Sequence, residues 1–315
     1  MEKFPGPDDI YGAAKRILPH VHRTPVMTCE SLNHLSGCTL FFKAENFQKV
    51  GAFKFRGASN AVFSLTDDEA RHGVATHSSG NHAAALALAA SRRGIKAHIV
   101  MPENAPEVKR AAVEGYDAEI SYCKPTLAAR EKGLEEVVER TGASFIHPYN
   151  DPRVIAGQAT AALELCDEID DLDIVMAPVG GGGLMSGTAL AVSAVSPKTR
   201  LVGAEPSGAD DAFRSLEAGR LIPSENPKTI ADGLLTSLGT LTFAILSDRL
   251  EQIVTVGDES IVSAMRKVFE RMKIVIEPSA AVPLAAVFDG SFSQRGKRIG
   301  IILSGGNVAL DNLPF

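Results

Sequence analysis

The hydrophobic positions of this chain fall into short apolar runs separated by longer segments in which polar and apolar residues are mixed. The most apolar runs, 174–179 and 299–303, are continuously hydrophobic and do not alternate with polar residues. A strand that is apolar on both faces is typical of a parallel sheet covered by helices on both sides. The pattern therefore predicts an α/β fold built on parallel sheets.

Strands and helices are expected to alternate along most of the chain. The expected strands are 39–45, 73–77, 96–101, 117–123, 144–147, 173–179, 200–205, 251–256 and 298–303. The expected helices are 8–18 with Asp8 as its cap, about 54–63, 81–93, 106–114, 126–140, 153–168, 183–194, one that starts at Asp210, and 258–273. Gly94, Gly115 and Gly142 follow three of these helices, where glycine is favoured as the C-cap.

Composition narrows the class of protein. The 315 residues are 45% hydrophobic and 22% charged, which is typical of a globular protein long enough for two domains. A net charge of −6 without a basic tract argues against a nucleic-acid partner. No apolar run reaches the length of a membrane span, and the N-terminus lacks a signal-peptide core. The four scattered cysteines predict reduced thiols in the cytoplasm rather than a disulfide or zinc framework.

One lysine, Lys54, lies between two phenylalanines in the segment G-A-F-K-F-R-G at 51–57. An amine among apolar groups loses hydration, which lowers its pKa and favours the neutral form that a Schiff-base lysine needs. The same residues also suit a lysine that covers its stem with aromatic rings and keeps its ammonium group in water. The local sequence leaves both interpretations open.

Four consecutive glycines, Gly180, Gly181, Gly182 and Gly183, follow the expected strand 173–179 and open the next helix. Glycines at this place let backbone N–H groups converge on an anion, and the helix N-terminus adds a favourable dipole. A tight turn without a ligand is the alternative, but four glycines lose more conformational entropy than an ordinary turn requires. The segment matches neither G-x-x-x-x-G-K-[ST] nor G-x-G-x-x-G, so we expect a phosphate site of another kind.

A dense hydrogen-bonding loop is formed by Ser78, Ser79, Gly80, Asn81 and His82, between an expected strand and an expected helix. Serine and asparagine are also ordinary helix caps, which is the simpler explanation for such a run. Two hydroxyls, an amide and an imidazole at a helix N-terminus would suit the carboxylate of a substrate.

Two further segments with candidate binding residues directly follow expected strands. S-G-G-N at 304–307 follows the last strand, at the carboxyl edge where open α/β sheets bind ligands, although a glycine-rich turn is the alternative. Glu205 and Asp211 flank the turn after strand 200–205 and could together bind a hard divalent cation. Their spacing alone favours a simpler explanation, in which Asp210 and Asp211 interact with the dipole of the helix that they begin.

Together these segments resemble the fold-type II pyridoxal-phosphate (PLP) enzymes, specifically the serine/threonine dehydratase and serine racemase branch. The matching motifs run through the chain in the order of the family: G-A-F-K-F-R-G at 51–57, S-S-G-N-H at 78–82, G-G-G-G-L at 180–184, A-E-P-S-G-A-D-D at 204–211, T-I-A-D-G at 229–233, E-P-S-A-A at 277–281 and S-G-G-N at 304–307. The resemblance implies two doubly wound open-sheet domains like those of the tryptophan synthase β chain, with the cofactor between them. The large domain would comprise 1–47 and 146–315, and the small domain 48–145.

The resemblance also implies a role for individual residues. Lys54 would hold the cofactor as a Schiff base, Phe53 would lie against the pyridine ring, and Asn81 would hydrogen-bond the ring hydroxyl. Gly180 to Gly183 would bind the phosphate, and Ser304 would face the pyridine nitrogen. Glu205, the carbonyl of Ala209, and Asp211 correspond to the divalent-cation site (Mg, Ca or Mn) of the racemase branch. The resemblance therefore favours a cation site here over the helix-dipole explanation that spacing alone favours.

Elimination is the expected reaction. A hydroxyl such as that of Ser304 cannot supply the charge with which an aspartate would keep the pyridine nitrogen protonated, so the ring is a weaker electron sink. Early loss of a β-hydroxyl suits that arrangement, with Lys54 as the general base. We expect a dehydratase (ammonia-lyase) that converts serine, threonine or 3-hydroxyaspartate to a keto acid and ammonia. Ser79, on the opposite face of the substrate α-carbon in the racemase branch, makes serine racemisation the alternative.

The remaining expectations concern substrate choice and control. Arg130 falls where the racemase branch has an arginine near the site and could pair with a second carboxylate; otherwise it is a solvated helix charge. Because the chain ends at Phe315, we expect no C-terminal amino-acid-sensing domain and no isoleucine feedback. The resemblance implies a homodimer and leaves a nucleotide effector open. A non-catalytic sensor of an amino acid or phosphate is the alternative from another class, although retention of Lys54 argues against it.

Overall fold

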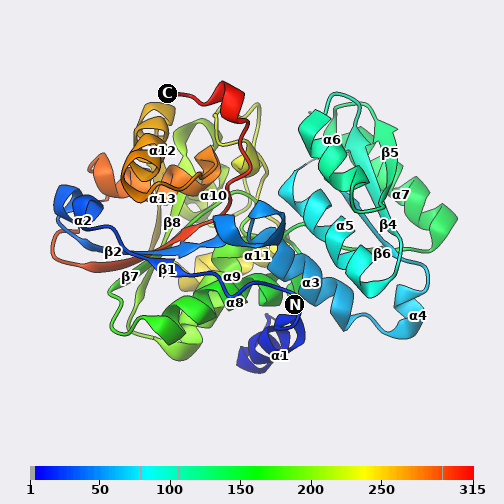
Figure 1. Ribbon diagram of the computed structural model, residues 1–315, viewed down its shortest axis with the longest axis horizontal. Coiled ribbons are helices and arrows are strands. Elements are labelled where there is room, and N and C mark those ends of the chain that lie inside the picture. The colour runs from blue at the N-terminus through cyan, green and yellow to red at the C-terminus, as the bar shows by residue number, and fades with distance from the viewer. Residues whose placement is uncertain (1–3, 79, 106, 293) are drawn as a thin grey trace.

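Two β-sheets covered by helices lie side by side in the computed structural model of the protein (Figure 1). The structure describes residues 4–78, 80–105, 107–292 and 294–315. The larger sheet has six strands in the order β1-β2-β10-β7-β8-β9, and the smaller has four in the order β5-β4-β3-β6. All pairs of neighbouring strands are parallel except β1 with β2. The expected α/β class with parallel sheets is therefore confirmed.

The six-stranded sheet draws its strands from both ends of the chain. These strands are β1 (Val26–Met27), β2 (Thr39–Ala44), β7 (Ile174–Pro178), β8 (Arg200–Pro206), β9 (Gln252–Val256) and β10 (Arg298–Leu303). Its helices are α1 (Pro7–Ile17), α2 (Glu30–Ser36), α8 (Pro152–Glu168), α9 (Gly183–Val195), α10 (Asp211–Ala218), α11 (Thr240–Arg249), α12 (Asp258–Met272) and α13 (Pro278–Phe288).

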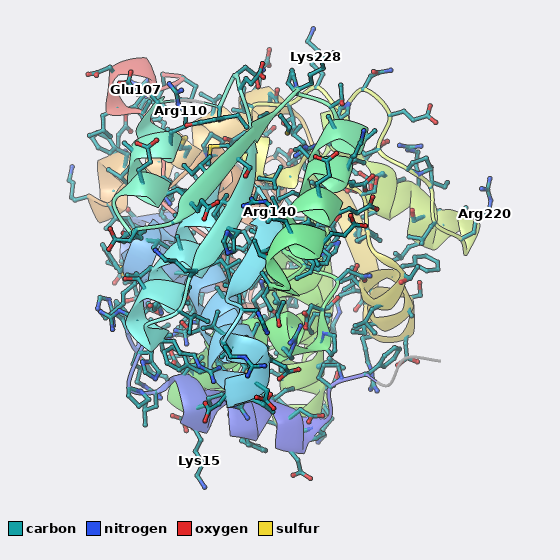
Figure 2. The ribbon with its side chains drawn as sticks, turned by 90° about the vertical axis from the view of Figure 1, so that its right-hand side faces the viewer. Lys15, Glu107, Arg110, Arg140, Arg220 and Lys228 are labelled. Carbon is teal, nitrogen blue, oxygen red and sulfur yellow. The ribbon has the colours of Figure 1, made fainter. Side chains whose placement is uncertain are left out.

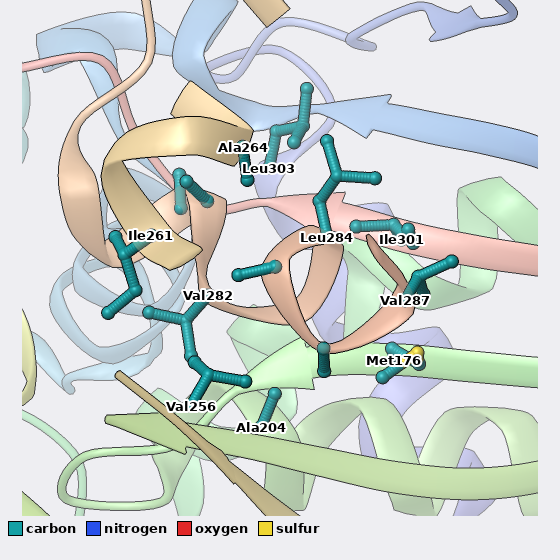
Figure 3. Packing of buried hydrophobic residues seen from close by; sticks show 14 of the residues in the cluster. Met176, Ala204, Val256, Ile261, Ala264, Val282, Leu284, Val287, Ile301 and Leu303 are labelled. Atoms are coloured by element: carbon teal, nitrogen blue, oxygen red, sulfur yellow. The ribbon is translucent and has the colours of Figure 1, made fainter. Parts of the chain in front are cut away.

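Helices cover both faces of this sheet, which explains its continuously apolar strands. Met176 and Ile301 lie in one buried cluster with residues of α2, α12 and α13 on one face of the sheet. Figure 3 shows part of this cluster, including Ile261 of α12 and Val282 of α13. The neighbouring side chain Val175 points to the other face, where α1, α8, α9 and α11 pack. Successive residues of a strand point to opposite faces, so a strand buried on both sides is apolar at every position.

The four-stranded sheet has a helical layer on each face. Its strands are β3 (Val74–His77), β4 (Ala97–Pro102), β5 (Glu119–Cys123) and β6 (Ser144–Phe145), and the associated helices are α3 (Lys54–Ser64), α4 (Asp67–Ala70), α5 (Asn81–Arg93), α6 (Glu107–Glu114) and α7 (Leu127–Thr141). Ile99 of β4 packs with α3 and α5, whereas Val100 packs with α7. Figure 2 views the molecule from this side, with Arg140 of α7 near the centre and Lys15, Arg220 and Lys228 projecting from well-separated parts of the surface.

Most expected elements are present, with shifts of one to two residues at many ends. Five short 3₁₀ helices complete the described elements: Glu45–Phe47, Lys49–Gly51, Ser207–Ala209, Asp232–Leu234 and Leu310–Asn312. Three predictions at helix ends differ from the structure. Asp8 does not cap α1, because the chain enters the helix at Gly6 and the carboxylate of Asp9 accepts the Gly6 N–H at 2.8 Å. Asp210 is the N-cap of α10 rather than its first residue, and Gly115 does not adopt the left-handed conformation seen at Gly94 and Gly142.

Helices α2, α4, α11 and α13 and strand β1 were not predicted. The apolar run of α13 is interrupted by Pro283, and proline inside a helix normally argues against one because it lacks an N–H donor. Here the helix is retained because ten of its eleven residues, from Pro278 to Val287, are buried in the core of the large sheet. Tertiary burial outweighs local propensity at this position.

A buried ionic cluster fixes the helix that carries Lys54. Arg56 pairs with Glu45 at 2.7 Å and with Glu164 of α8 at 2.7 Å, and Lys43 of β2 pairs with Glu164 at 2.6 Å. The side chains of Lys43, Glu45 and Arg56 have no exposed surface. Two cations and two carboxylates balance within the cluster, so no charge is left uncompensated in the core. The cluster ties the first turn of α3 to β2 and α8.

Helix α8 lies between α3 and α9, with a glycine at each close approach. A Cβ atom on Gly157 would lie 2.6 Å from the carbonyl oxygen of Arg56, and one on Gly187 would lie 2.6 Å from that of Ile155. Only glycine permits these separations. The lysine-bearing helix and the helix that follows the four glycines are thus held at a fixed spacing through α8.

Candidate active site

A cavity of about 240 Å³ lies where the carboxyl ends of strands from both sheets meet. Strand β10 leads into Ser304, β7 into the four glycines, and β3 into Ser78. Parallel strands present their carboxyl ends at one edge, which is where such sheets bind ligands. The cavity is lined by every described residue predicted to bind cofactor or substrate: Phe53, Lys54, Ser78, Gly80, Asn81, His82, Arg130, Gly180, Gly181, Gly182, Gly183 and Ser304. Ser79 lies outside the described residues.

Lys54 is positioned by the end of the last strand. The N–H of Phe53 donates to the carbonyl of Ser304 at 3.0 Å, and Ala52 forms an antiparallel bridge with Gly305. These contacts join the start of α3 to the carboxyl end of β10. Lys54 and Ser304, which are 250 positions apart in the sequence numbering, therefore lie on the same cavity wall.

The amine of Lys54 lies between an aromatic ring and a backbone carbonyl. Nζ is 5.2 Å from the centroid of the Phe53 ring and donates to the carbonyl oxygen of Pro148 at 2.9 Å. Burial lowers the pKa of this amine to about 8, although the nearby Glu277 carboxylate acts in the opposite direction. A substantial fraction of the amine is then neutral slightly above pH 7, and a neutral amine can act as a nucleophile or a base. Of the two interpretations of the local sequence, the structure favours the buried amine.

The four-glycine turn leaves no room for side chains. A Cβ on Gly180 would lie 2.8 Å from Leu234 Cα, and one on Gly181 would lie 2.4 Å from Tyr149 Cδ1. Gly182 has a φ of 83°, which L side chains rarely adopt. Helix α9 begins at Gly183, and the first N–H groups of a helix have no acceptor within it. Backbone donors directed into a cavity at a helix N-terminus suit a phosphate group.

Asn81 is held by residues from the large sheet. Its amide nitrogen donates to both carboxylate oxygens of Glu277 at 3.1 Å, and its amide oxygen accepts from Asn307 at 2.9 Å. Asn307 also donates to the carbonyl of Val50 at 2.7 Å. The orientation of the Asn81 amide is therefore fixed by residues associated with the large sheet.

The wall contributed by the small sheet carries buried polar atoms that have unused hydrogen-bonding capacity. His77 Nδ1, His82 Nδ1 and Arg130 Nε are buried and make no hydrogen bond among the described residues. Burial lowers the pKa of His77, and it lowers that of His82 well below its ordinary value with help from the charge of Lys54. Both rings are therefore neutral near pH 7. An anionic substrate would supply an acceptor for Arg130 Nε.

Glu205 and Asp211 lie close to the cavity but not in its lining. Both side chains are fully buried, and the carboxylate of Glu205 accepts the N–H groups of Ala212 at 3.1 Å and Phe213 at 2.9 Å. Burial raises the pKa of Glu205 to about 9, and burial raises that of Asp211 to about 6. Among the described residues, neither carboxylate oxygen of Asp211 makes a hydrogen bond of ordinary geometry. The Ser224 hydroxyl and the N–H of Leu238 nevertheless oppose the rise in the pKa of Asp211.

These two carboxylates have the chemistry of a hard-cation site. They are buried near each other, the charge of Asp211 adds to the rise in the pKa of Glu205, and Ala209 between them in the sequence is also buried. Oxygen ligands of this kind suit a magnesium or calcium ion. No cluster of three or more His, Cys, Asp or Glu side chains that could hold a metal occurs in the described part of the chain.

Several residues that line the cavity were not predicted from the sequence. Glu277 contacts Asn81 and influences Lys54, yet it was noted only as part of the E-P-S-A-A motif. His77, Tyr149 and Thr236 also line the cavity and were not assigned a role from the sequence. The position of His77 directly before the Ser78 loop was an available signal. Tyr149 and Thr236 follow no pattern in the sequence that would mark them.

Within the described residues, no helix has both the length and the apolar character needed to cross a membrane. All four cysteines have free thiols.

Comparison with known proteins gives the chain a family. The model of the family described as pyridoxal-phosphate dependent enzyme matches residues 17–305. The chain is 51% identical over 312 residues to a beta-hydroxyaspartate dehydratase of Paracoccus denitrificans (strain Pd 1222), covering 99% of both proteins. It is 46% identical to an L-threo-3-hydroxyaspartate ammonia-lyase of Saccharomyces cerevisiae, covering 95% of this chain and 92% of that protein.

Among solved structures, a maize serine racemase superimposes with a TM-score of 0.96 at 46% identity, covering 98% of this chain and 95% of the other. The glycine turn with its helix N-terminus, the buried amine of Lys54 and the fixed amide of Asn81 fit a phosphorylated pyridine cofactor. The sensor alternative is thereby set aside. The chain belongs to the fold-type II pyridoxal-phosphate dependent enzymes and is an enzyme of the lyase and racemase type.

Proposed function

We propose that this enzyme eliminates the hydroxyl group of a β-hydroxy amino acid that carries a second carboxylate, such as 3-hydroxyaspartate, and releases a keto acid and ammonia. The observation that carries the proposal is Arg130, which lines the same cavity as Lys54 and has a buried Nε without an acceptor among the described residues. A guanidinium group binds a carboxylate through two parallel hydrogen bonds. Serine and threonine, which lack a second carboxylate, are the other proposed substrates of the same reaction.

When bound, pyridoxal phosphate supplies an electron sink that stabilises negative charge on the substrate α-carbon. Lys54 acts as the general base at this carbon, since its pKa of about 8 leaves neutral amine available. The β-hydroxyl leaves as water once it has been protonated, and hydrolysis of the enamine product consumes one water to give ammonia and the keto acid. The net reaction is thus a deamination.

The remaining residues bind the cofactor and the substrate and orient them. Gly180 to Gly183 hold the phosphate, Phe53 lies against the ring, Asn81 donates to the ring hydroxyl, and Ser304 faces the ring nitrogen. The support for these roles is that all of them line the cavity. The loop from Ser78 to His82 binds the α-carboxylate, because it precedes and opens helix α5, whose N-terminus favours an anion.

Racemisation is the second candidate function. Ser79 would carry a proton on the face of the α-carbon opposite Lys54, as a two-base racemase requires. What favours this candidate is the likeness to maize serine racemase over nearly the whole chain. Chiral analysis of the products from L-serine separates the two functions: D-serine that accumulates faster than pyruvate would contradict the primary assignment.

A divalent cation bound by Glu205, the carbonyl of Ala209, and Asp211 is proposed as a structural cofactor. The support is the buried, mutually destabilising carboxylate pair. A cation would allow both carboxylates to ionise without a desolvation penalty. The test is thermal unfolding with and without Mg²⁺: the midpoint should rise with the cation in the parent protein and stay constant in Asp211→Asn.

The assembly and location are proposed from the resemblance. We propose a large domain of 1–47 and 146–315, a small domain of 48–145, and a homodimer that works in the cytoplasm. A nucleotide effector at the subunit interface stays a proposal as well. Sedimentation with and without ATP, followed by activity assays at the same concentrations, tests the dimer and the effector together.

The experiment that tests the main proposal is a keto-acid release assay on the holoenzyme with 3-hydroxyaspartate, serine and threonine, with and without Mg²⁺. We expect oxaloacetate from 3-hydroxyaspartate to form with the highest kcat/KM. A yellow protein that is bleached by borohydride would show that the cofactor is in place. Keto acid from serine or threonine at a higher kcat/KM would overturn the preference for a second carboxylate, and no keto acid from any substrate would overturn the function.

A further inference from the structure

Tyr149 lines the cavity, although no sequence pattern around it predicted this position. It follows Pro148, whose carbonyl accepts the hydrogen bond from Lys54, and it lines the cavity together with Arg130 and Thr236. The side chain is partly buried. A tyrosine in this position places a phenolic hydroxyl in the same cavity as the proposed base.

The ring of Tyr149 is held rigidly. Its Cδ1 lies 2.4 Å from where a Cβ on Gly181 would be, and its Cβ lies 2.8 Å from the corresponding position at Gly183. On another side it contacts the ring of His147 edge-on, with centroids 4.6 Å apart and an interplanar angle of 86°. A ring packed on both sides presents its hydroxyl at a defined point, so little conformational entropy is lost when that hydroxyl binds a ligand.

The polar surroundings of the hydroxyl include a second hydroxyl and a cation. Burial raises the pKa of Tyr149, the Asp211 carboxylate adds to this rise, and the Thr236 hydroxyl and the Arg130 guanidinium oppose it. The phenol therefore keeps its proton at neutral pH and can donate a hydrogen bond. Arg130 and Tyr149 line the same cavity, so one anion bound there could contact both side chains.

We propose that the Tyr149 hydroxyl donates a hydrogen bond to the second carboxylate of the substrate, alongside Arg130, and thereby determines the preference for dicarboxylic over monocarboxylic β-hydroxy amino acids. This inference rests on the proposed function and extends it from Arg130 to a second, rigidly held donor. Tyr149 is a specificity residue here and takes no part in proton transfer at the α-carbon.

The test compares Tyr149→Phe with the parent holoenzyme, because phenylalanine keeps the packed ring and removes only the hydroxyl. L-Aspartate and L-asparagine serve as the probes, since they have nearly the same shape, differ in the second charge and lack a β-hydroxyl to eliminate. Binding of each is followed through the visible absorption of the cofactor. The parent should bind L-aspartate more tightly than L-asparagine, and Tyr149→Phe should lose about 10-fold in L-aspartate affinity with little change for L-asparagine.

Turnover should show the same selectivity. In Tyr149→Phe, kcat/KM for 3-hydroxyaspartate should fall about 10-fold through a higher KM, while kcat/KM for serine should change less than about 2-fold. Tyr122→Phe is the matched control, because Tyr122 lies on β5, is 47% exposed and does not line the cavity. It should leave every value unchanged.

Three results would overturn the inference. Equal losses of affinity for L-aspartate and L-asparagine in Tyr149→Phe would show that Tyr149 has only a packing role. Unchanged L-aspartate binding would show that its hydroxyl does not contact the second carboxylate. A parent enzyme that does not prefer L-aspartate would show that there is no site for a second carboxylate. Failure of the proposed function is distinguishable, because it would appear as absence of keto acid from every β-hydroxy amino acid. The binding comparison does not depend on turnover.

Discussion

The two walls of the active-site cavity are built in different ways. The large-sheet wall, formed by Gly180–Gly183 and Ser304, is made of backbone held at fixed distances by strand ends and close helix contacts. The small-sheet wall, formed by His77, His82 and Arg130, consists of side chains with buried nitrogen atoms that lack partners among the described residues.

This difference distinguishes a wall whose shape is already fixed from a wall whose buried polar atoms need hydrogen-bond partners from a ligand. A backbone turn with no room for a Cβ is preorganised for one group, and changes in it disturb a fit. Buried donors without acceptors are costly unless a ligand supplies the acceptor. We therefore assign the large-sheet wall to the cofactor and the small-sheet wall to the substrate. Substitutions in the two walls should have separable effects.

The largest effect is expected from Lys54→Ala. This change removes the only amine that lines the cavity within the described residues, so cofactor attachment and proton abstraction are both lost. The purified protein should lack the yellow colour, and keto-acid release should fall to the background of the assay. A Lys54→Ala protein that is yellow and bleached by borohydride would show that another amine holds the cofactor.

Arg130→Ala should affect the substrate and leave the cofactor in place. Loss of a charge-assisted pair is expected to lower kcat/KM for 3-hydroxyaspartate about 100-fold, with less than about 3-fold for serine. Cofactor affinity, measured from the visible absorption, should stay constant. Arg140→Ala on the same helix is the control, since Arg140 is 58% exposed and outside the cavity lining. Equal losses for both substrates would contradict the division between the walls.

Gly181→Ala should weaken cofactor binding more than it changes substrate selectivity. The added Cβ would meet the ring of Tyr149 at 2.4 Å, so the turn or the ring must move. We expect about 10-fold weaker cofactor binding and a destabilisation of about 1–3 kcal/mol, as for other overpacked sites. Gly257→Ala is the control, because no atom lies within 4 Å of its Cβ position. Unchanged cofactor affinity in Gly181→Ala would show that the turn does not hold the phosphate.

The smallest effect is expected from Glu277→Gln. The carboxylate of Glu277 raises the pKa of Lys54, against the larger effect of burial that brings it to about 8. Removing this negative charge should therefore move the pKa of Lys54 further down. The rate at which apoenzyme forms the yellow chromophore with added cofactor depends on neutral amine, so its midpoint should shift to lower pH. A shift to higher pH would show that the carboxylate does not act on Lys54 through its charge.

Local patterns were sufficient for the architecture and for much of the cavity lining. The apolar strand 299–303 indicated a sheet buried on both faces, and β10 is buried between α8 and α13. Three motif segments, at 78–82, 180–184 and 304–307, located lining residues because they follow β3, β7 and β10, whose carboxyl ends reach the same edge. The missed helix α13 shows the limit: its proline is tolerated only because the surrounding core buries the helix.

The sequence by itself determined the fold class, the family resemblance and the segments that meet in the cavity, since periodicity and motif order are local properties. Tertiary structure decided what those segments do to one another. Burial between two sheets lowers the pKa of Lys54, Glu277 reaches Asn81 from 196 positions away, and Tyr149 comes to lie against Gly181. Desolvation and Coulomb interactions depend on distances in space, and these distances are set by packing between elements that are remote in the chain.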